Sequence, residues 1–151
     1  MKKNLLVVCT LLLSVALIAG CGGPQRPPGM PQLYSCVLTF QFEDGTPVAD
    51  AGVSLVPDSM ELAQWSISGR TDSSGVARIH TRGDFVGAPS GTYTVTVRKE
   101  EVFQTNERDE DGELMNDVRL VTPTRYADSS LSPFKLEIGN AAVTQTFQLQ
   151  R

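Results

Sequence analysis

The sequence has 151 residues, 40% of them hydrophobic and 20% charged, and a formal net charge of −4 at pH 7. This length suits one globular domain and is short for two. Nucleic-acid binding needs a concentrated basic surface, so the acidic balance argues against nucleic acid as a partner. Beyond the N-terminal 30 residues, valine and threonine dominate the regular segments and long helical windows are missing. This composition predicts an all-β domain.

The N-terminal segment has the features of an export signal. Lys2 and Lys3 precede an apolar run from Leu5 to Ala19. The run is shorter than the roughly 20 residues that a transmembrane helix needs, and it matches the basic and apolar regions of a signal peptide. We therefore expect residues 1–20 to be a signal peptide. Without the two lysines, 11 basic and 17 acidic residues leave a formal charge of −6.

The end of this run, Ile18-Ala19-Gly20-Cys21, resembles the lipobox of bacterial lipoproteins. The resemblance implies cleavage before Cys21, diacylation of its sulfur with palmitate-like chains, and acylation of the new amine. Two or more acyl chains hold a protein stably on a membrane. In that family an aspartate after the cysteine retains many members at the inner membrane, so Gly22 favours the outer membrane, outside the cytoplasm. The alternative is an ordinary secretory signal followed by a cysteine.

Residues 21–33 are predicted to be the lipidated cysteine and a tether. The stretch GGPQRPPGMPQ is rich in proline and glycine and has no apolar periodicity. Such a segment buries too little apolar surface to fold. In polyproline form, at about 3.1 Å per residue, it would hold a domain roughly 30 Å from the membrane.

Residues 34–151 are predicted to form one domain of seven short strands, interrupted by an acidic insertion at about 99–122. Period-2 alternation of apolar and polar residues marks each strand, and turn residues such as Thr71–Gly75 separate them. The strands are expected at 35–43, 52–57, 63–69, 76–82, 93–97, 133–138 and 143–149. The side chains expected to point inward are those of Cys36, Leu38, Phe40, Phe42, Val53, Leu55, Trp65, Ile67, Ala77, Ile79, Thr81, Tyr93, Val95, Val97, Phe134, Leu136, Ile138, Phe147 and Leu149.

The order of three segments resembles the carboxypeptidase regulatory-like domains. These segments are GTPVADAGVSLVP (45–57), SGRTDSSGVARI (68–79) and GAPSGTYTVTV (87–97). The later PTRYAD (123–128), the Ser132-Pro133 pair and residues 134–138 resemble a subgroup of small bacterial lipoproteins on the same fold. The resemblance implies a seven-stranded Greek-key β-sandwich of the transthyretin-like, or prealbumin-like, type. It implies no activity, because such domains are typically non-catalytic accessory or surface modules.

The sequence offers few residues for catalysis. His80 is the single histidine, and it lies on a predicted strand between Arg78 and Arg82, so we assign no catalytic residue and no cofactor. Cys36 is the one cysteine left after Cys9 and Cys21 are accounted for, which excludes an intrachain disulfide. Its inward parity predicts a buried thiol, with an intermolecular disulfide or a reactive thiol as the alternatives.

Residues 100–117 carry eight carboxylates and one arginine, a net charge of −7. Asp109, Asp111 and Glu113 alternate as in short calcium loops, but the pattern lacks a closing bidentate glutamate. They are therefore weak metal candidates, and no metal site is assigned. The favoured interpretation is a flexible, solvated insertion. Divalent-cation binding and docking of the segment onto Arg78, His80 and Arg82 are the alternatives.

These observations predict an exported, membrane-anchored lipoprotein without catalytic activity, which acts as a structural or protein-interaction module of the cell envelope. Its expected partners are the membrane, through lipid on Cys21, and another envelope protein. The alternative is a ligand- or carbohydrate-binding module at the cell surface. That function usually requires clustered exposed aromatic side chains, and the single tryptophan, Trp65, has inward parity.

Overall fold

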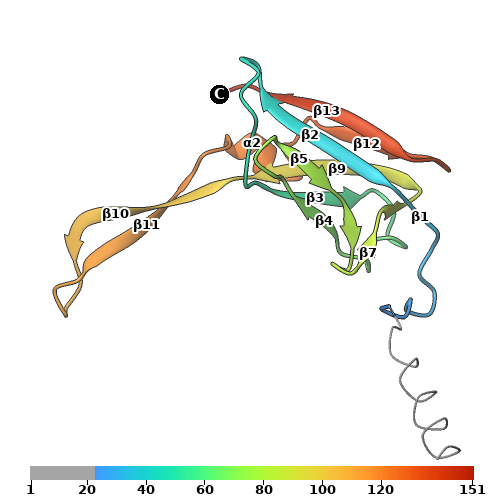
Figure 1. Ribbon diagram of the computed structural model, residues 1–151, viewed down its shortest axis with the longest axis horizontal. Helices are drawn as coiled ribbons and strands as arrows, with labels where there is room; N and C mark the ends of the chain where they lie inside the picture. Colours follow the sequence, from blue (N-terminus) through green and yellow to red (C-terminus); the bar gives the residue numbers. More distant parts are fainter. Residues whose placement is uncertain (1–22) are drawn as a thin grey trace, which may run out of the picture.

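The computed structural model describes residues 23–151, which consist mostly of β-strands (Figure 1). The predicted all-β class is therefore confirmed. The elements are β1 (Leu33–Tyr34), β2 (Cys36–Phe42), β3 (Gly52–Pro57), β4 (Ile67–Arg70), β5 (Val76–Arg78), β6 (His80–Thr81), β7 (Phe85–Val86), β8 (Ala88–Pro89), β9 (Gly91–Arg98), β10 (Glu100–Arg108), β11 (Leu114–Leu120), α2 (Thr124–Ala127), β12 (Lys135–Ile138) and β13 (Val143–Leu149).

Residues 23–151 form four sheets, and two of them make up the body of the domain. One has the strand order β12-β9-β3-β4-β6-β7, and the other has the order β13-β2-β5. The second sheet is mixed, since β13 pairs with β2 in parallel while β5 pairs with β2 antiparallel. The remaining sheets are the short β1–β8 pair and the β10–β11 hairpin.

Side chains from both main sheets meet in one hydrophobic core. Phe40 and Phe147 stack with ring centroids 5.4 Å apart. Phe134, next to the first sheet, has its ring centroid 4.8 Å from that of Phe147. The predicted inward set is confirmed, because every member is buried except the partly buried Phe134.

The predicted strand at 76–82 is wrong in one respect. It is two strands in different sheets, because β5 pairs with β2 and β6 pairs with β4. The N–H of Ile79, between them, donates to the carbonyl of Cys36 at 3.0 Å. Ala77, Ile79 and Thr81 are all buried. Every second side chain therefore continues to face the core where the chain crosses from one sheet to the other.

The strand β9 was expected to be buried on one face, and it is partly covered on both. Tyr93, Val95 and Val97 are buried in the core, and Thr94 and Thr96 on the opposite face are buried as well. β9 contacts α2, and the ammonium of Lys135 donates to Thr94 Oγ1 at 2.6 Å. The polar face of this strand is therefore used for packing rather than for solvent exposure.

The predicted signal peptide and Cys21 lie outside the described residues. The segment free to act as a tether is shorter than the predicted 21–33, because Met30 packs against the core and Leu33 pairs with Pro89. The distance that the tether can span is correspondingly reduced. Within residues 23–151, no helix is both long enough and apolar enough to span a membrane.

Candidate interaction hairpin

The acidic segment forms an antiparallel hairpin that extends away from the two main sheets (Figure 1). β10 has nine residues, and at about 3.3 Å per residue it reaches roughly 30 Å. The register pairs Glu101 with Arg119 and Val102 with Val118, and it shifts between Gln104 and Arg108. The expected flexible insertion is therefore an ordered β-hairpin in the structure.

The turn at the tip is built by one aspartate and one glycine. Asp109 Oδ1 accepts the N–H groups of Asp111 at 3.0 Å and Glu113 at 2.9 Å. Gly112 has φ +83°, which a residue with a Cβ adopts only with strain. Asp109 is thus engaged in the turn. Among the described residues, no group of three or more acidic, histidine or cysteine side chains is placed to hold a metal ion.

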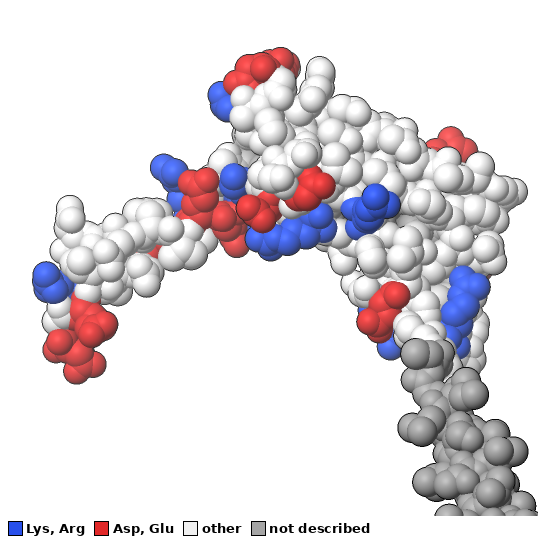
Figure 2. Space-filling model, viewed as in Figure 1, with Lys and Arg blue, Asp and Glu red and all other residues white. Residues whose placement is uncertain are grey.

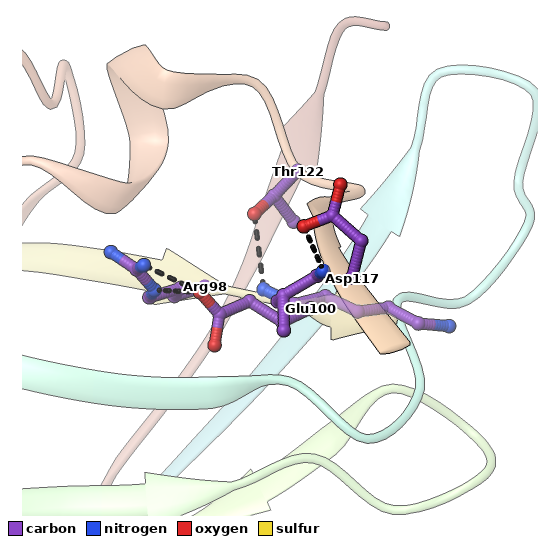
Figure 3. Close-up of polar contacts among 6 residues, drawn as sticks. Arg98, Glu100, Asp117 and Thr122 are labelled. Carbon is purple, nitrogen blue, oxygen red and sulfur yellow. Dashed lines mark hydrogen bonds and ion pairs between the residues drawn. The ribbon is translucent and has the colours of Figure 1, made fainter. Parts of the chain in front are cut away.

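The base of the hairpin is held by ion pairs and one buried hydroxyl (Figure 3). The Nε of Arg98 donates to Glu100 at 2.9 Å. Thr122 is fully buried, and its Oγ1 accepts the N–H of Lys99 at 3.1 Å. These contacts join the end of β9 to the start of β10 and fix the direction in which the hairpin leaves the domain.

Glu101 is the centre of a small ionic network on one face of the hairpin. It accepts a hydrogen bond from Arg119 at 2.9 Å, and Lys99 Nζ lies 3.7 Å from its other carboxylate oxygen. The pKa of Glu101 is lowered, mainly by the hydrogen bond that its carboxylate accepts from Arg119. Arg119 and Glu101 have 67% and 44% of their side-chain surface exposed, and Lys99 has 23%. Solvent therefore screens these ion pairs, and they weaken as salt is added.

Both faces of the hairpin expose apolar side chains. Val102 and Val118 are paired on one face, with 69% and 54% of their surface exposed. Phe103 and Met115, on the other face, are 44% and 45% exposed. Isolated two-stranded hairpins are at best marginally stable in water, and exposed apolar clusters commonly mark interaction sites. The hairpin therefore combines open strand edges with apolar surface.

The charges of the hairpin are arranged along its length. Carboxylates gather at its tip, and mixed charges lie at its base (Figure 2). The ion pairs of its carboxylates found among the described residues are with Arg98, Lys99 and Arg119. Within one chain the segment does not dock onto Arg78, His80 and Arg82. These residues lie between the start of β5 and the start of β7, and the hairpin extends away from both strands (Figure 1).

A shallow cleft of about 490 Å³ lies beside β4, β5 and β6 and contains His80. Ser68 is opposite His80 in the β4–β6 ladder, and Asp72 lines the same cleft. Asp72 Oδ1 accepts the N–H groups of Ser74 and Val76. Among the side-chain hydrogen bonds of residues 23–151, none links the His80 imidazole to Ser68 or Asp72. The three side chains share a cleft without forming an acid–base relay.

Two buried groups near β9 have raised pKa values. Burial raises the pKa of the Cys36 thiol to about 11, and Cys36 is 2% exposed. The expected buried thiol is therefore confirmed. Burial raises the pKa of Tyr93 to about 12, and its hydroxyl donates to the carbonyl of Pro89 at 2.8 Å. Both groups stay protonated at neutral pH and are poor candidates for nucleophiles.

The apolar residues of the hairpin were missed by the sequence analysis. A signal for them was present, since Asp111-Gly112 is a common hairpin turn and Val102, Phe103 and Thr105 favour strands. The high acidity of the segment drew the interpretation toward a solvated loop.

Comparisons with known proteins give no family. No protein-family model matches the chain, and no curated protein matches it. Among solved structures, the chain is similar to a 9R-lipoxygenase from Cyanothece PCC8801, with 16% sequence identity and a TM-score of 0.34. The match covers 93% of this chain and 20% of the lipoxygenase.

Proposed function

We propose that this chain is an exported lipoprotein, anchored through lipid on Cys21, that acts as a non-catalytic interaction module of the cell envelope. The lipobox-like sequence before Cys21 supports the anchor and a position outside the cytoplasm, and Gly22 favours the outer membrane. The β10–β11 hairpin is the proposed contact with another envelope protein. The observation that carries this proposal is the exposure of Val102, Phe103 and Val118 on an element held away from the core.

The fold part of the proposal is a seven-stranded Greek-key sandwich of the transthyretin-like type, as in carboxypeptidase regulatory-like domains. Its support is the matching order of segments at 45–57, 68–79 and 87–97, together with the single core shared by two sheets. The non-catalytic part is supported by the environment of His80, which has Arg78 and Arg82 as near neighbours in sequence. It is also supported by the burial of Cys36.

A shortened hairpin tests this function. Residues 102–118 are replaced by Asn-Gly, so that a two-residue turn joins Glu101 to Arg119, which face each other in the ladder. We expect the free energy of unfolding to change by less than about 1 kcal/mol, because no residue of the deleted segment is buried. Urea denaturation measures this change.

Envelope proteins that co-purify with the full chain from detergent-solubilised membranes are expected not to co-purify with the shortened variant. The matched control is Val86→Ser, which removes an exposed apolar side chain of β7 and should retain them. Recovery of the same proteins with the shortened variant at wild-type yield would refute the hairpin as the contact.

A further inference from the structure

The outer edge of β11 carries unused backbone hydrogen-bonding groups. The N–H of Val121 donates to the carbonyl of Lys99, and hydrogen-bonded pairs alternate along an antiparallel ladder. In this register Arg119 and Asp117 bond to β10, while Asn116, Val118 and Leu120 direct their N–H and C=O groups away from it. No third strand pairs with the hairpin among the described residues.

The contact at Val118 supports this assignment. Its N–H donates to the side chain of Asp117 at 2.7 Å rather than to a neighbouring strand (Figure 3). The backbone N–H that would donate to a further strand therefore donates to the solvent-exposed carboxylate of the adjacent residue. Such an edge is available for pairing with another strand.

We propose that β11 pairs with β11 of a second copy, antiparallel and centred on Val118, so that two hairpins form one four-stranded sheet. The side chains of the edge are self-complementary in this register. Asp117 of each copy lies opposite Arg119 of the other, which gives two pairs of opposite charge related by a two-fold axis. Isologous contacts of this kind close as dimers.

The apolar residues support the same register. Val102 is already opposite Val118 on one face. Pairing at Val118 extends this to an uninterrupted row of four valines across the four strands, and such cross-strand neighbours have Cβ atoms about 4.5–5.5 Å apart. Shifting the centre to Asp117 would place two aspartates opposite each other, which is unfavourable.

The charge distribution favours β11 over β10 as the shared edge. β11 has one acidic and one basic residue, whereas β10 carries Glu100, Glu101 and Glu107 with only Arg108 to balance them. Two copies meeting along β10 would therefore repel each other. The inference rests on the proposed function in one respect: a common membrane anchor would raise the local concentration of copies and favour a weak contact.

Charge exchange tests the pairing in the full chain, purified in mild detergent and measured by sedimentation velocity. Wild type is expected to form dimers. Asp117→Arg and Arg119→Asp should each weaken dimerisation by roughly tenfold or more, because like charges then face each other. An equimolar mixture of the two variants should dimerise as well as wild type, since every facing pair is again of opposite charge. Arg151→Asp is the control, because it makes the same kind of charge exchange at a residue outside the hairpin. This variant should dimerise normally.

Cysteine cross-linking tests the register in the membrane. Val118→Cys is expected to form a disulfide between copies, because facing residues lie within the Cα–Cα range of such bonds. Asn116→Cys should not, since residue 116 would lie opposite residue 120 and about 13 Å from its own counterpart. A monomeric wild type, a mixture that fails to dimerise, or equal cross-linking at both positions would each overturn the proposal.

These outcomes are distinguishable from those of the proposed function. If Val118→Cys does not cross-link but the shortened hairpin still loses envelope proteins, the hairpin binds a different protein and the self-pairing is wrong. If Val118→Cys cross-links but the shortened hairpin retains those proteins, the self-pairing holds and the proposed contact is wrong.

Discussion

Gly75→Ala is expected to destabilise the domain by about 4 kcal/mol or more, a large part of the 5–15 kcal/mol that stabilises a typical domain. Gly75 has φ +77°, and a Cβ there would lie 2.3 Å from the carbonyl oxygen of Phe40. That contact is with backbone, so it cannot be relieved by a rotamer change. The Phe40 N–H also donates to the Gly75 carbonyl at 2.8 Å, and this bond would be strained. Urea denaturation gives the magnitude.

Gly45→Ala is the matched control for this prediction. Gly45 has φ +82°, but a Cβ there would meet no atom within 4 Å. The free energy of unfolding of this variant should fall only by the cost of placing alanine in the left-handed region, roughly 1–2 kcal/mol. Equal decreases in the free energy of unfolding of the two variants would contradict the close approach of Gly75 to β2.

Cys21→Ala is expected to abolish incorporation of radiolabelled palmitate. The resemblance of residues 18–21 to a lipobox implies that the Cys21 sulfur carries the diacyl group and that cleavage occurs just before this cysteine. The variant should therefore also keep residues 1–20, which intact-protein mass spectrometry detects.

Cys9→Ala is the control for the anchor, because it removes a cysteine from the apolar run and leaves the lipobox-like residues intact. It should be labelled and cleaved like wild type. Labelling of Cys21→Ala at wild-type level would show that lipid is attached elsewhere or that the label reports no acylation.

Strands with one buried face could be predicted from the sequence. Phe40, Leu55 and Phe147 lie in segments where apolar and polar residues alternate, and burial of one face imposes that alternation. Tyr93 was also predicted to point inward, and it is fully buried with its hydroxyl donating to the carbonyl of Pro89.

Features without a local signature could not be predicted. The change of sheet at Ile79 leaves the period-2 pattern intact, because both sheets face the same core. The helix α2 has four residues, too few for a helical period. The hairpin has no buried face, so Val102 and Phe103 are apolar neighbours rather than alternating positions. The candidate site was therefore visible in the sequence only as a charged segment.

We propose that the hairpin is the surface through which this protein contacts other proteins of the envelope. A photo-cross-linking amino acid placed at Phe103 in the full chain, irradiated in intact cells, tests it most directly. Val86, exposed on β7 of the body, is the matched control position. We predict a protein adduct of defined mass at position 103 and none at position 86. Adducts at position 86 alone, or at neither position, would show that the hairpin is not the contact surface.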